Sequence, residues 1–281
     1  MKTNVTVVIA TKDRASELTQ TLNRLLELPE QPAITVVDNH SHDQTSSMVR
    51  QYYPSVRLIT LNINLGGAAR NVGAAAAATD YVAFSDDDSW WQPGSLKKAA
   101  SILKRHPTVG LVAAHIRVEP AGRADPVCAA MANSPLPARP GLPGKPILGF
   151  LACAAVVNKS AFLAAGGFEQ RMLIGGEEEL LSLDLATKSW DLIYVEDIVA
   201  LHQPSRKRDT AARQRRQARN KLWTAWLRRP LPVAFAMTFH TLLSSNRAER
   251  LGAIEAGAAL GWALRHRVVI PPELEQRVRL L

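Results

Sequence analysis

Three adjacent carboxylates, Asp86, Asp87 and Asp88, follow a short apolar run at residues 81–85. Carboxylates crowded at the end of a buried strand repel one another, and a divalent cation relieves that repulsion. Oxygen ligands of this kind suit Mg²⁺ or Mn²⁺, and these ions in turn bind phosphate groups. A solvated acidic turn that leads into a helix is the structural alternative. The triplet by itself is compatible with both.

Two more polar groups directly follow apolar runs near the N-terminus. They are Thr11, Asp13 and Arg14 after residues 5–10, and Asp38 with Asn39 after residues 33–37. A carboxylate at the second position is suited to bind the edge of a nucleotide base or a ribose. Asp and Asn are also common in helix caps and turns, so a purely structural role is the alternative.

A glycine-rich segment, residues 64–73, follows the next apolar run and includes Asn64, Gly67 and Arg70. Glycines at the start of a helix let backbone amides approach a ligand, and the permanent charge of arginine suits a carboxylate or a phosphate. No Gly-Lys-Ser/Thr sequence follows, so the segment is not a Walker loop. The pattern Gly-x-Gly-x-x-Gly does not follow the first apolar run either, which disfavours a nicotinamide enzyme.

Glu177, Glu178 and Glu179 open a predicted helix directly after two glycines. Acidic side chains stabilise a helix N-terminus by up to about 1 kcal/mol each, which is a sufficient structural reason for them. The glycines also indicate close packing or a nearby ligand, so Glu177 or Glu178 is a candidate general base. His202 ends a later apolar run. A lone histidine there is usually structural, but it is also a candidate third metal ligand.

Alternating apolar and amphipathic segments must position these polar groups. We predict strands at residues 5–10, 33–37, 56–61 and 81–85, with helices from residue 16 and over residues 66–78. Uniformly apolar strands that alternate with amphipathic helices indicate a parallel sheet covered on both faces. Ligands bind at the carboxyl ends of the strands in such sheets, so the polar groups are expected to converge at one edge.

The second half of the chain is expected to be less regular. The predicted elements are a strand over residues 109–118, an irregular loop over 120–146, a strand over 147–157, helices over 160–165 and 177–188, and extended segments over 192–195 and 198–201. From residue 209 the pattern is helical, with breaks expected at Pro230, Pro232 and Pro271-Pro272. The proline-rich loop is a candidate lid, because loops of that length are usually functional or mobile.

The length of 281 residues allows one large domain or two small ones. The sequence shows neither a signal peptide nor a run of about 18 apolar residues that would span a membrane. Its two cysteines, Cys128 and Cys153, form neither a disulfide framework nor a zinc motif. We therefore expect reduced thiols in a cytoplasmic protein.

The chain carries 34 Lys and Arg residues against 25 Asp and Glu residues, and residues 205–229 account for the whole excess. A basic face in solvent is the default explanation for such a segment. The second explanation is contact with a phosphate-rich partner, either lipid head groups or nucleic acid. Leu222, Trp223, Trp226 and Leu227 lie beside several arginines, which makes an interfacial helix at a membrane a third hypothesis to test.

Together the motifs resemble the family 2 glycosyltransferases with the GT-A fold, over roughly residues 4–205. The segments that carry the resemblance are 7–14, 36–45, 64–73, 84–88, and 166–169 with 176–178. Five ordered motifs at workable spacings are far more specific than any one of them.

The resemblance implies an α/β fold of the GT-A type, in which helices flank a Rossmann-like, mostly parallel central sheet. The implied glycosyltransferase domain is residues 1–205, with a nucleotide-sugar half at 1–118 and an acceptor half at 119–205. Residues 206–281 would form a basic helical C-terminal extension.

The resemblance also assigns roles to the candidate residues. The donor nucleotide would contact Thr11, Asp13, Arg14, Asp38, Asn64, Gly67, Arg70, Asp86 and Asp87. The ligands of Mg²⁺ or Mn²⁺ would be Asp88, Asp86 and His202. Glu178, or else Glu177, would deprotonate an acceptor hydroxyl that attacks with inversion at the anomeric carbon. Trp90 and Trp91 would stack on a sugar at the acceptor side, unless they belong to the core.

The implied partners are a nucleotide-diphosphate sugar and a hydroxyl acceptor, which is a small molecule or a lipid-linked saccharide. Lipid-linked acceptors are frequent in the family, so peripheral contact with an anionic membrane at its inner face is favoured over nucleic acid. The sequence departs from the family at Glu178, Asp184 and Ala152, where Asp, Arg and Gly are common. These departures bear on the identity of the acceptor.

Two other functional classes stay open. A nucleotidyltransferase would also combine carboxylates, a metal and a nucleotide, but only Lys12 and Arg14 near the first strand are suited to grip a triphosphate. A non-catalytic, membrane-associated scaffold that binds a nucleotide sugar would need neither the acid at position 178 nor the intact triplet.

Overall fold

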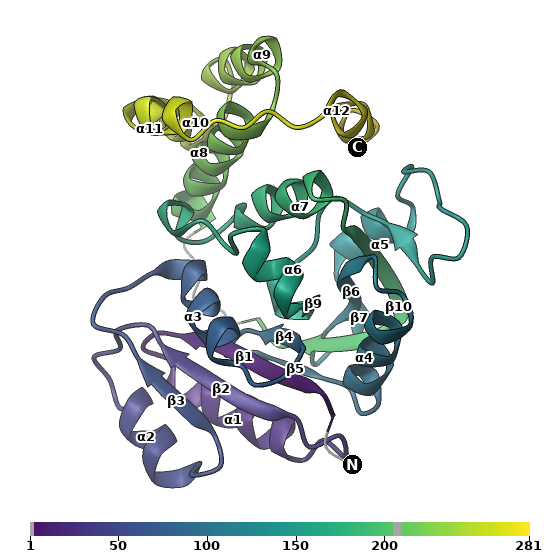
Figure 1. Ribbon diagram of the computed structural model, residues 1–281. Coiled ribbons are helices and arrows are strands. Elements are labelled where there is room, and N and C mark those ends of the chain that lie inside the picture. Colours follow the sequence, from purple (N-terminus) through teal and green to yellow (C-terminus); the bar gives the residue numbers. More distant parts are fainter. Residues whose placement is uncertain (1–2, 205–209) are drawn as a thin grey trace.

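The computed structural model describes residues 3–204 and 210–281. Within these residues, ten strands form one mixed sheet in the order β3-β2-β1-β4-β9-β6-β10-β5, with β7 paired to β6 and β8 to β10 (Figure 1). The strands are β1 (Val5–Thr11), β2 (Ala33–Asp38), β3 (Arg57–Thr60), β4 (Tyr81–Ser85), β5 (Ser89–Trp91), β6 (Val109–Val118), β7 (Arg123–Ala124), β8 (Lys145–Pro146), β9 (Ala155–Asn158) and β10 (Asp191–His202). This arrangement confirms the predicted α/β class.

The strands β3, β2, β1 and β4 are parallel, and Thr11 at the end of β1 is level with Asp38 at the end of β2. Helices α1 (Ala15–Leu26) and α2 (Thr45–Tyr52) cover one face, whereas α3 (Ala69–Ala76) packs on β1 and β2 from the other (Figure 1). The side chains of β1, β2 and β4 are buried almost throughout, which explains their uniformly apolar sequences. We call the edge formed by the carboxyl ends of β1, β2 and β4 the carboxyl rim.

The predicted strand over residues 147–157 is wrong in its first part. Residues 152–154 form a 3₁₀ turn, and β9 begins at Ala155 and pairs antiparallel to both β4 and β6. Ile147 and Phe150 still bury their side chains in the core. The apolar run therefore indicated correctly that these side chains are buried, but it did not indicate the conformation of the backbone.

The predicted loop over residues 120–146 contains a helix, α5 (Pro126–Ala132). Asp125 caps it by accepting a hydrogen bond from the Val127 amide at 3.0 Å, and proline occupies the first helical position. The helix is held to the sheet by Cys128, a buried free thiol. The helices predicted over residues 160–165 and 177–188 form α6 (Lys159–Ala164) and α7 (Glu177–Thr187), and the structure adds α4 (Ser95–Arg105), for which no bounds were predicted.

The two extended segments predicted near residue 200 join in one long strand, β10. It runs parallel to β6, with a register shift between Val195 and Val199. At its end it also pairs antiparallel with β5, so that His202 lies opposite Ser89.

Helices occupy the C-terminal part, residues 210–281. They are α8 (Thr210–Arg228), α9 (Leu231–Leu242), α10 (Arg247–Ala258), α11 (Leu260–Arg265) and α12 (Pro272–Val278). Figure 1 shows α8 to α11 gathered beyond α7, on the side of the molecule away from α1 and α2. The breaks at Pro230 and Pro271-Pro272 are confirmed, whereas Pro232 lies in the first turn of α9, where a helix tolerates proline. Residues 205–209, which begin the basic segment and contain the predicted domain boundary, lie outside the described residues.

The apolar side chains of α8 face the other helices and not the surface. Leu222, Trp223, Trp226 and Leu227 are at most 7% exposed, and the Trp223 and Trp262 rings meet edge to face at 5.5 Å. The hypothesis that these side chains form a membrane interface is therefore wrong. No helix in the described ranges is long and apolar enough to cross a membrane.

Candidate active site

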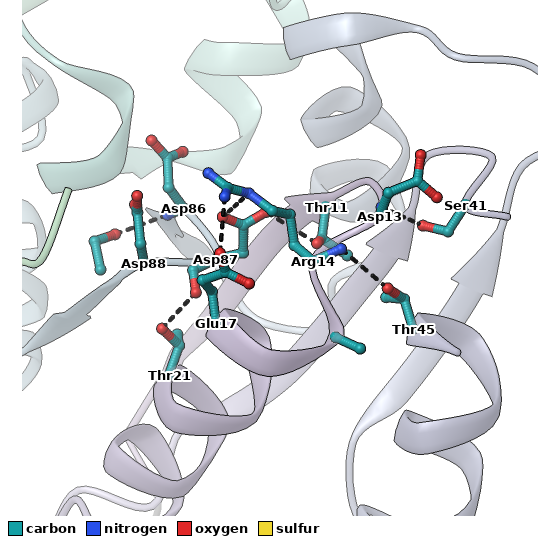
Figure 2. Close-up of polar contacts among 12 residues, drawn as sticks. Thr11, Asp13, Arg14, Glu17, Thr21, Ser41, Thr45, Asp86, Asp87 and Asp88 are labelled. Carbon is teal, nitrogen blue, oxygen red and sulfur yellow. Dashed lines mark hydrogen bonds and ion pairs between the residues drawn. The ribbon is translucent and has the colours of Figure 1, made fainter. Parts of the chain in front are cut away.

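The acidic triplet lies at the carboxyl rim, directly beyond β4. The Thr11 hydroxyl donates a hydrogen bond to the Asp87 carboxylate at 3.0 Å, and the Arg14 side chain reaches the same carboxylate at 3.6 Å (Figure 2). From α1, the Thr21 hydroxyl donates to the backbone carbonyl of Asp87 at 2.8 Å. The ends of β1 and β4 are thereby joined, as the parallel register predicted.

The negative charges of Asp86 and Asp88 act on Asp87 and are only partly offset by the positive charge of Arg14. Burial raises the pKa of Asp87 from 3.8 to about 7, the adjacent charges of Asp86 and Asp88 add to this, and Arg14 only partly offsets it. A carboxylate that is buried beside two others gains from an added cation. The triplet is therefore an electrostatic arrangement that favours cation binding.

Asp88 pairs with His202, whose Nε2 lies 3.3 Å from the Asp88 carboxylate, and both side chains are buried. The sheet itself sets this pair, because β5 turns back from the triplet and Ser89 lies opposite His202 on β10. The Ser89 hydroxyl also accepts a hydrogen bond from the Asp86 amide at 2.7 Å.

Arg70 links the triplet to the start of α7. Its guanidinium donates to the Asp86 carboxylate and lies over the Phe168 ring, 5.8 Å from the ring centre. Burial alone would lower the pKa of Arg70, but the charges of Asp86, Glu177 and Glu178 outweigh it and raise the pKa. Arg70 is thus the cation shared by the carboxylates on both sides of the site.

Glu177 is 2% exposed, and burial raises its pKa from 4.5 to about 8, with Glu178 adding to the rise and Arg70 opposing it. One of its carboxylate oxygens, Oε2, is buried without a hydrogen-bond partner within the described residues. A Cβ atom at Gly67 would lie only 2.6 Å from the other oxygen. The glycine is needed there because Glu177 occupies the space that a side chain would fill.

Glu178 is only partly buried, and two backbone amides point at its carboxylate. The Ala152 and Gly176 amides each donate to it at 3.4 Å. The next residue of that turn, Cys153, accepts a hydrogen bond from Ser89 at 3.4 Å. A continuous set of contacts therefore runs from the triplet through Ser89 and the 3₁₀ turn to Glu178.

The loops after β1 and β2 are locked to each other. Asp13, which has a left-handed backbone (φ 54°), accepts from the His42 amide at 2.6 Å, and Ser41 accepts from the Asp13 amide at 2.9 Å. The hydrogen bond from His42 is the main reason that the pKa of Asp13 is lowered. The Asp38 carboxylate is buried and accepts from the Ser41 amide and the Ser46 hydroxyl. A nucleotide contact by Asp38 would replace one of these bonds.

Asn64 and Gly67 lie in the segment that joins β3 to α3. Asn64 accepts from the Gly66 amide at 2.8 Å, and the Gly67 amide donates to the carbonyl of Leu173. The close backbone approach that the glycines indicated is thus an approach to Leu173 and Glu177 within the protein.

The two tryptophans after the triplet point to different places. Trp91 is 1% exposed and belongs to the core, so its expected stacking on an acceptor sugar does not fit the structure. Trp90 is partly exposed and lines a cavity of about 630 Å³ together with Asn23, Arg24 and Gln203. This cavity lies beside α1 and not beside Glu178.

Two asparagines have positioning roles that sequence reasoning missed. Asn39 donates to the Gly66 carbonyl at 3.1 Å and accepts from the Leu65 amide at 2.7 Å, which joins β2 to the glycine segment. Asn71 makes the same two-way contact with the backbone of Phe168, at 2.9 Å in each direction. Asn39 lies in segment 36–45 and Asn71 in segment 64–73, both of which carry the family resemblance, and this was the indication that the sequence offered.

The residues present fit a divalent cation that is shared with a ligand. Among the described residues, no group of three or more His, Cys, Asp or Glu side chains is arranged to hold a metal ion without further ligands. Mg²⁺ commonly binds through one or two carboxylates together with substrate phosphates, and imidazole also suits the transition metals. Asp88 and His202 supply two donor atoms of this kind beside Asp87, the carboxylate whose pKa is raised.

The mixed α/β sheet and the acidic triplet at its rim agree with the fold that the sequence motifs predict. Residues 6–163 match the sequence profile described as Glycosyl transferase family 2, and the chain belongs to this family.

A relative covers most of the chain. It is the N-acetylglucosaminyl-diphospho-decaprenol L-rhamnosyltransferase of Mycobacterium tuberculosis, 27% identical over 85% of this chain and 93% of that protein. A shorter match is the poly(ribitol-phosphate) β-N-acetylglucosaminyltransferase TarS of Staphylococcus aureus, 32% identical over 36% of this chain and 19% of that protein.

Solved structures confirm the GT-A fold. TarS of S. aureus superposes with a TM-score of 0.63 at 19% identity, over 100% of this chain and 52% of that chain, so this chain spans about half of it. The mannosyltransferase PcManGT of Pyrobaculum calidifontis, solved in complex with GDP-Man and Mn²⁺, gives a TM-score of 0.58 at 20% identity over 95% of this chain and 73% of that chain.

Proposed function

We propose that the protein transfers a sugar from a nucleotide-diphosphate donor to an acceptor hydroxyl, with inversion at the anomeric carbon. The observation that carries the proposal is the excess of buried carboxylate at the carboxyl rim, which raises the pKa of Asp87 to about 7. Such an excess is costly unless a cation and its phosphate ligand compensate it. Membership of family 2 supports the same reaction class.

The donor nucleotide would lie along the rim. The side chains and backbone groups proposed to hold it are those of Thr11, Asp13, Arg14, Asp38, Asn64, Gly67, Arg70, Asp86 and Asp87. The solved complexes of TarS with UDP-GlcNAc and of PcManGT with GDP-Man show that proteins of this fold bind nucleotide sugars. Arg70, buried and shared between the triplet and α7, would orient the donor between the two acidic groups.

Asp88 and His202, assisted by Asp86, would hold Mg²⁺ or Mn²⁺. When bound, the ion would neutralise the charge that develops on the leaving diphosphate. PcManGT and GalNAc-T7 were each solved with Mn²⁺, which supports a divalent cation in proteins of this fold. Asp86 is the weaker ligand candidate, because its carboxylate is already paired with Arg70.

Glu178 is the better candidate for the general base. Burial raises the pKa of Glu177 and favours its protonated form, and the residue is only 2% exposed, so it is poorly placed to take a proton from an acceptor. Glu178 is partly exposed. It would take the proton of the acceptor hydroxyl while the oxygen of that hydroxyl attacks the anomeric carbon. The bond from that carbon to the diphosphate then breaks, and its electron pair leaves with the diphosphate.

The acceptor would be a lipid-linked saccharide. The M. tuberculosis relative is named for an acceptor of this class, and the match covers 93% of that relative. Such an acceptor places the enzyme on the cytoplasmic side, at the inner face of an anionic membrane, with no role for nucleic acid. In this proposal residues 1–205 perform the reaction and residues 206–281 serve the acceptor side.

A pair of conservative variants tests the proposal. The purified chain is incubated with a panel of nucleotide sugars and Mn²⁺, and slow donor hydrolysis identifies the donor. With that donor, Glu178→Gln should lower turnover by roughly 10²- to 10⁴-fold while donor binding survives. Glu177→Gln, the matched control, should retain turnover within about tenfold.

Three results would contradict the proposal. Normal turnover in Glu178→Gln would remove Glu178 from the role of base. Release of pyrophosphate from a nucleoside triphosphate would indicate a nucleotidyltransferase. Binding of a donor without hydrolysis or transfer to any hydroxyl would indicate a scaffold.

A further inference from the structure

Helix α9 presents an uncovered apolar face. Its twelve residues include no Asp, Glu, Lys or Arg. Ala234, Met237 and Thr238 face inward, and Thr238 accepts a hydrogen bond from the Trp226 indole at 3.0 Å. On the outer side, large apolar residues recur at intervals of three and four. They are Leu231, Phe235, Phe239, Leu242 and, just past the helix, Leu243, which are between 42% and 67% exposed.

Two further exposed apolar residues lie in the segment that follows α11. The Val268 amide donates to the carbonyl of Leu227 at 2.9 Å, so this segment is fixed beside the end of α8, shortly before α9 begins. Val268 and Val269 are 60% and 47% exposed. Large apolar residues that recur on the exposed side of one helix, as they do on α9, mark an interaction site more often than scattered single residues do.

The charge of the surrounding helices identifies the partner. Residues 210–281 contain 13 Lys and Arg residues against 4 Glu residues and no Asp, whereas residues 3–204 contain 17 against 20. Arg213, Arg247 and Arg265 are exposed and form no ion pair within the described part of the chain. An apolar face that belongs to a strongly cationic helical region suits an anionic lipid surface.

We propose that the outer face of α9 docks the protein on an anionic lipid bilayer, with Phe239 and Leu243 inserted among the acyl chains and the exposed arginines of the helical region at the head groups, whereas the Phe235 ring also packs on Trp226 at 4.9 Å. A second copy of the chain fits this face less well. A symmetric dimer through α9 would bring two strongly cationic regions together, and such like-charge contact is unfavourable. The tryptophans of α8 serve a different purpose, since they fill the interior of the helical region.

Vesicle flotation of the full chain tests this docking surface. Vesicles of phosphatidylcholine alone are compared with vesicles that also contain phosphatidylglycerol, and neither contains an acceptor lipid. The wild-type chain should float with the anionic vesicles, and added salt should weaken the association. Phe239→Glu combined with Leu243→Glu should lower partitioning by about 100-fold, or about tenfold for each side chain.

Two control variants separate docking from folding and from catalysis. Tyr52→Glu changes an equally exposed apolar residue, 66% exposed on α2, and should float like the wild type. Glu178→Gln should also float normally, so that failure of the proposed reaction leaves this result intact. If the double variant unfolds, as judged by its circular dichroism melt, Leu243→Ser at the end of α9 replaces it with an expected loss of about tenfold.

The proposal is overturned if the wild-type chain does not float with anionic vesicles, or if the α9 variants float as well as the wild type. It is also overturned if the wild-type chain is a dimer by light scattering and the α9 variants are monomers. That outcome would assign the face to a second copy.

Discussion

Glu275 in the helical region meets two arginines, whereas Asp87 in the α/β region meets two other carboxylates. Arg229 and Arg279 contact Glu275 at 2.5 and 2.9 Å. Burial alone would raise the pKa of Glu275, but the hydrogen bonds from these arginines outweigh it and lower the pKa. At the rim the same kind of burial raises the pKa of Asp87 to about 7.

The difference distinguishes acids that join helices from the acids to which we assign a functional role. Asp184 follows the structural pattern, because Arg228 binds both of its oxygens, at 2.5 and 3.1 Å, and so joins α7 to α8. The arginine that is common in the family at this position is thus replaced by an acid that packs the helical region. In the helical region each of these acids is matched by arginine, whereas at the rim three adjacent carboxylates share Arg14 and Arg70 and their charge is only partly offset.

The largest expected effect comes from removing one carboxylate charge at the rim. Asp88→Asn should abolish metal-dependent binding of the nucleoside diphosphate, with a loss of at least about 100-fold, because it removes the proposed metal ligand and the carboxylate charge beside His202. Calorimetric titration with and without Mn²⁺ measures it. Asp184→Asn is the matched control, and it should leave diphosphate binding unchanged. Equal binding in Asp88→Asn would show that Asp88 holds no metal.

Opposite pH effects are expected for two glutamates. Because the folded protein holds a proton on Glu177 up to about pH 8, its ionisation costs stability as the pH rises from about 4.5 to 8. Glu177→Gln should therefore unfold with a free energy about 1–3 kcal/mol higher than the wild type at pH 9, and with little difference at pH 4.

Glu275 should behave in the other direction. Its lowered pKa means that its ion pairs stabilise the protein above about pH 4.5, and this contribution is lost as the pH falls through the folded pKa. Glu275→Gln should cost about 2–3 kcal/mol at pH 7 and less under acidic conditions. Urea unfolding of both variants across this pH range, without metal or nucleotide, measures the two slopes. If the difference in unfolding free energy between variant and wild type changes with pH in the same direction for both glutamates, the two acids do not differ as proposed.

Two glycines provide the smallest test. Gly66 has φ +59°, and a Cβ atom there would lie 2.4 Å from the Leu173 carbonyl. Gly66→Ala should cost about 1–3 kcal/mol and lower turnover, because it displaces the loop before Glu177. Gly257 in α10 has open space around it, and Gly257→Ala should stabilise the protein by about 0.5–1 kcal/mol. Chemical denaturation reports both, and an equal response would mean that the rim is no more constrained than the helices.

The parallel half of the sheet was predictable because strands that are buried on both faces have nearly continuous apolar sequences. The runs at β1, β2 and β4 are uniformly apolar, and their polar ends meet as the parallel register requires. The sequence placed Asp88 and His202 together only as candidate ligands of the same metal ion, and not as neighbours in the sheet. The cause of their pairing, the turn of β5 back onto β10, depends on contacts between residues that are far apart in the chain.

Other features could not be predicted from local pattern. In α8, Trp223 and Trp226 have the same helical spacing whether they face lipid or other helices, and the packing of α10 and α11 decides which. The docking face on α9 was missed for the complementary reason, since a helix that is apolar all round does not indicate which side is covered. The capped start of α5 at Asp125-Pro126 was visible in the sequence, but the density of prolines around it outweighed that signal.

The return of β5 onto β10 has a consequence for how the enzyme is assembled. A growing chain that has completed β5 already contains all three aspartates, yet the contact between Asp88 and His202 forms only when β10 has been synthesised and has joined the edge of the sheet. The ability to bind a donor should therefore appear late in folding, together with the pairing of the most distant strands. A truncated chain that stops before residue 191 would present the acidic sequence without the binding site.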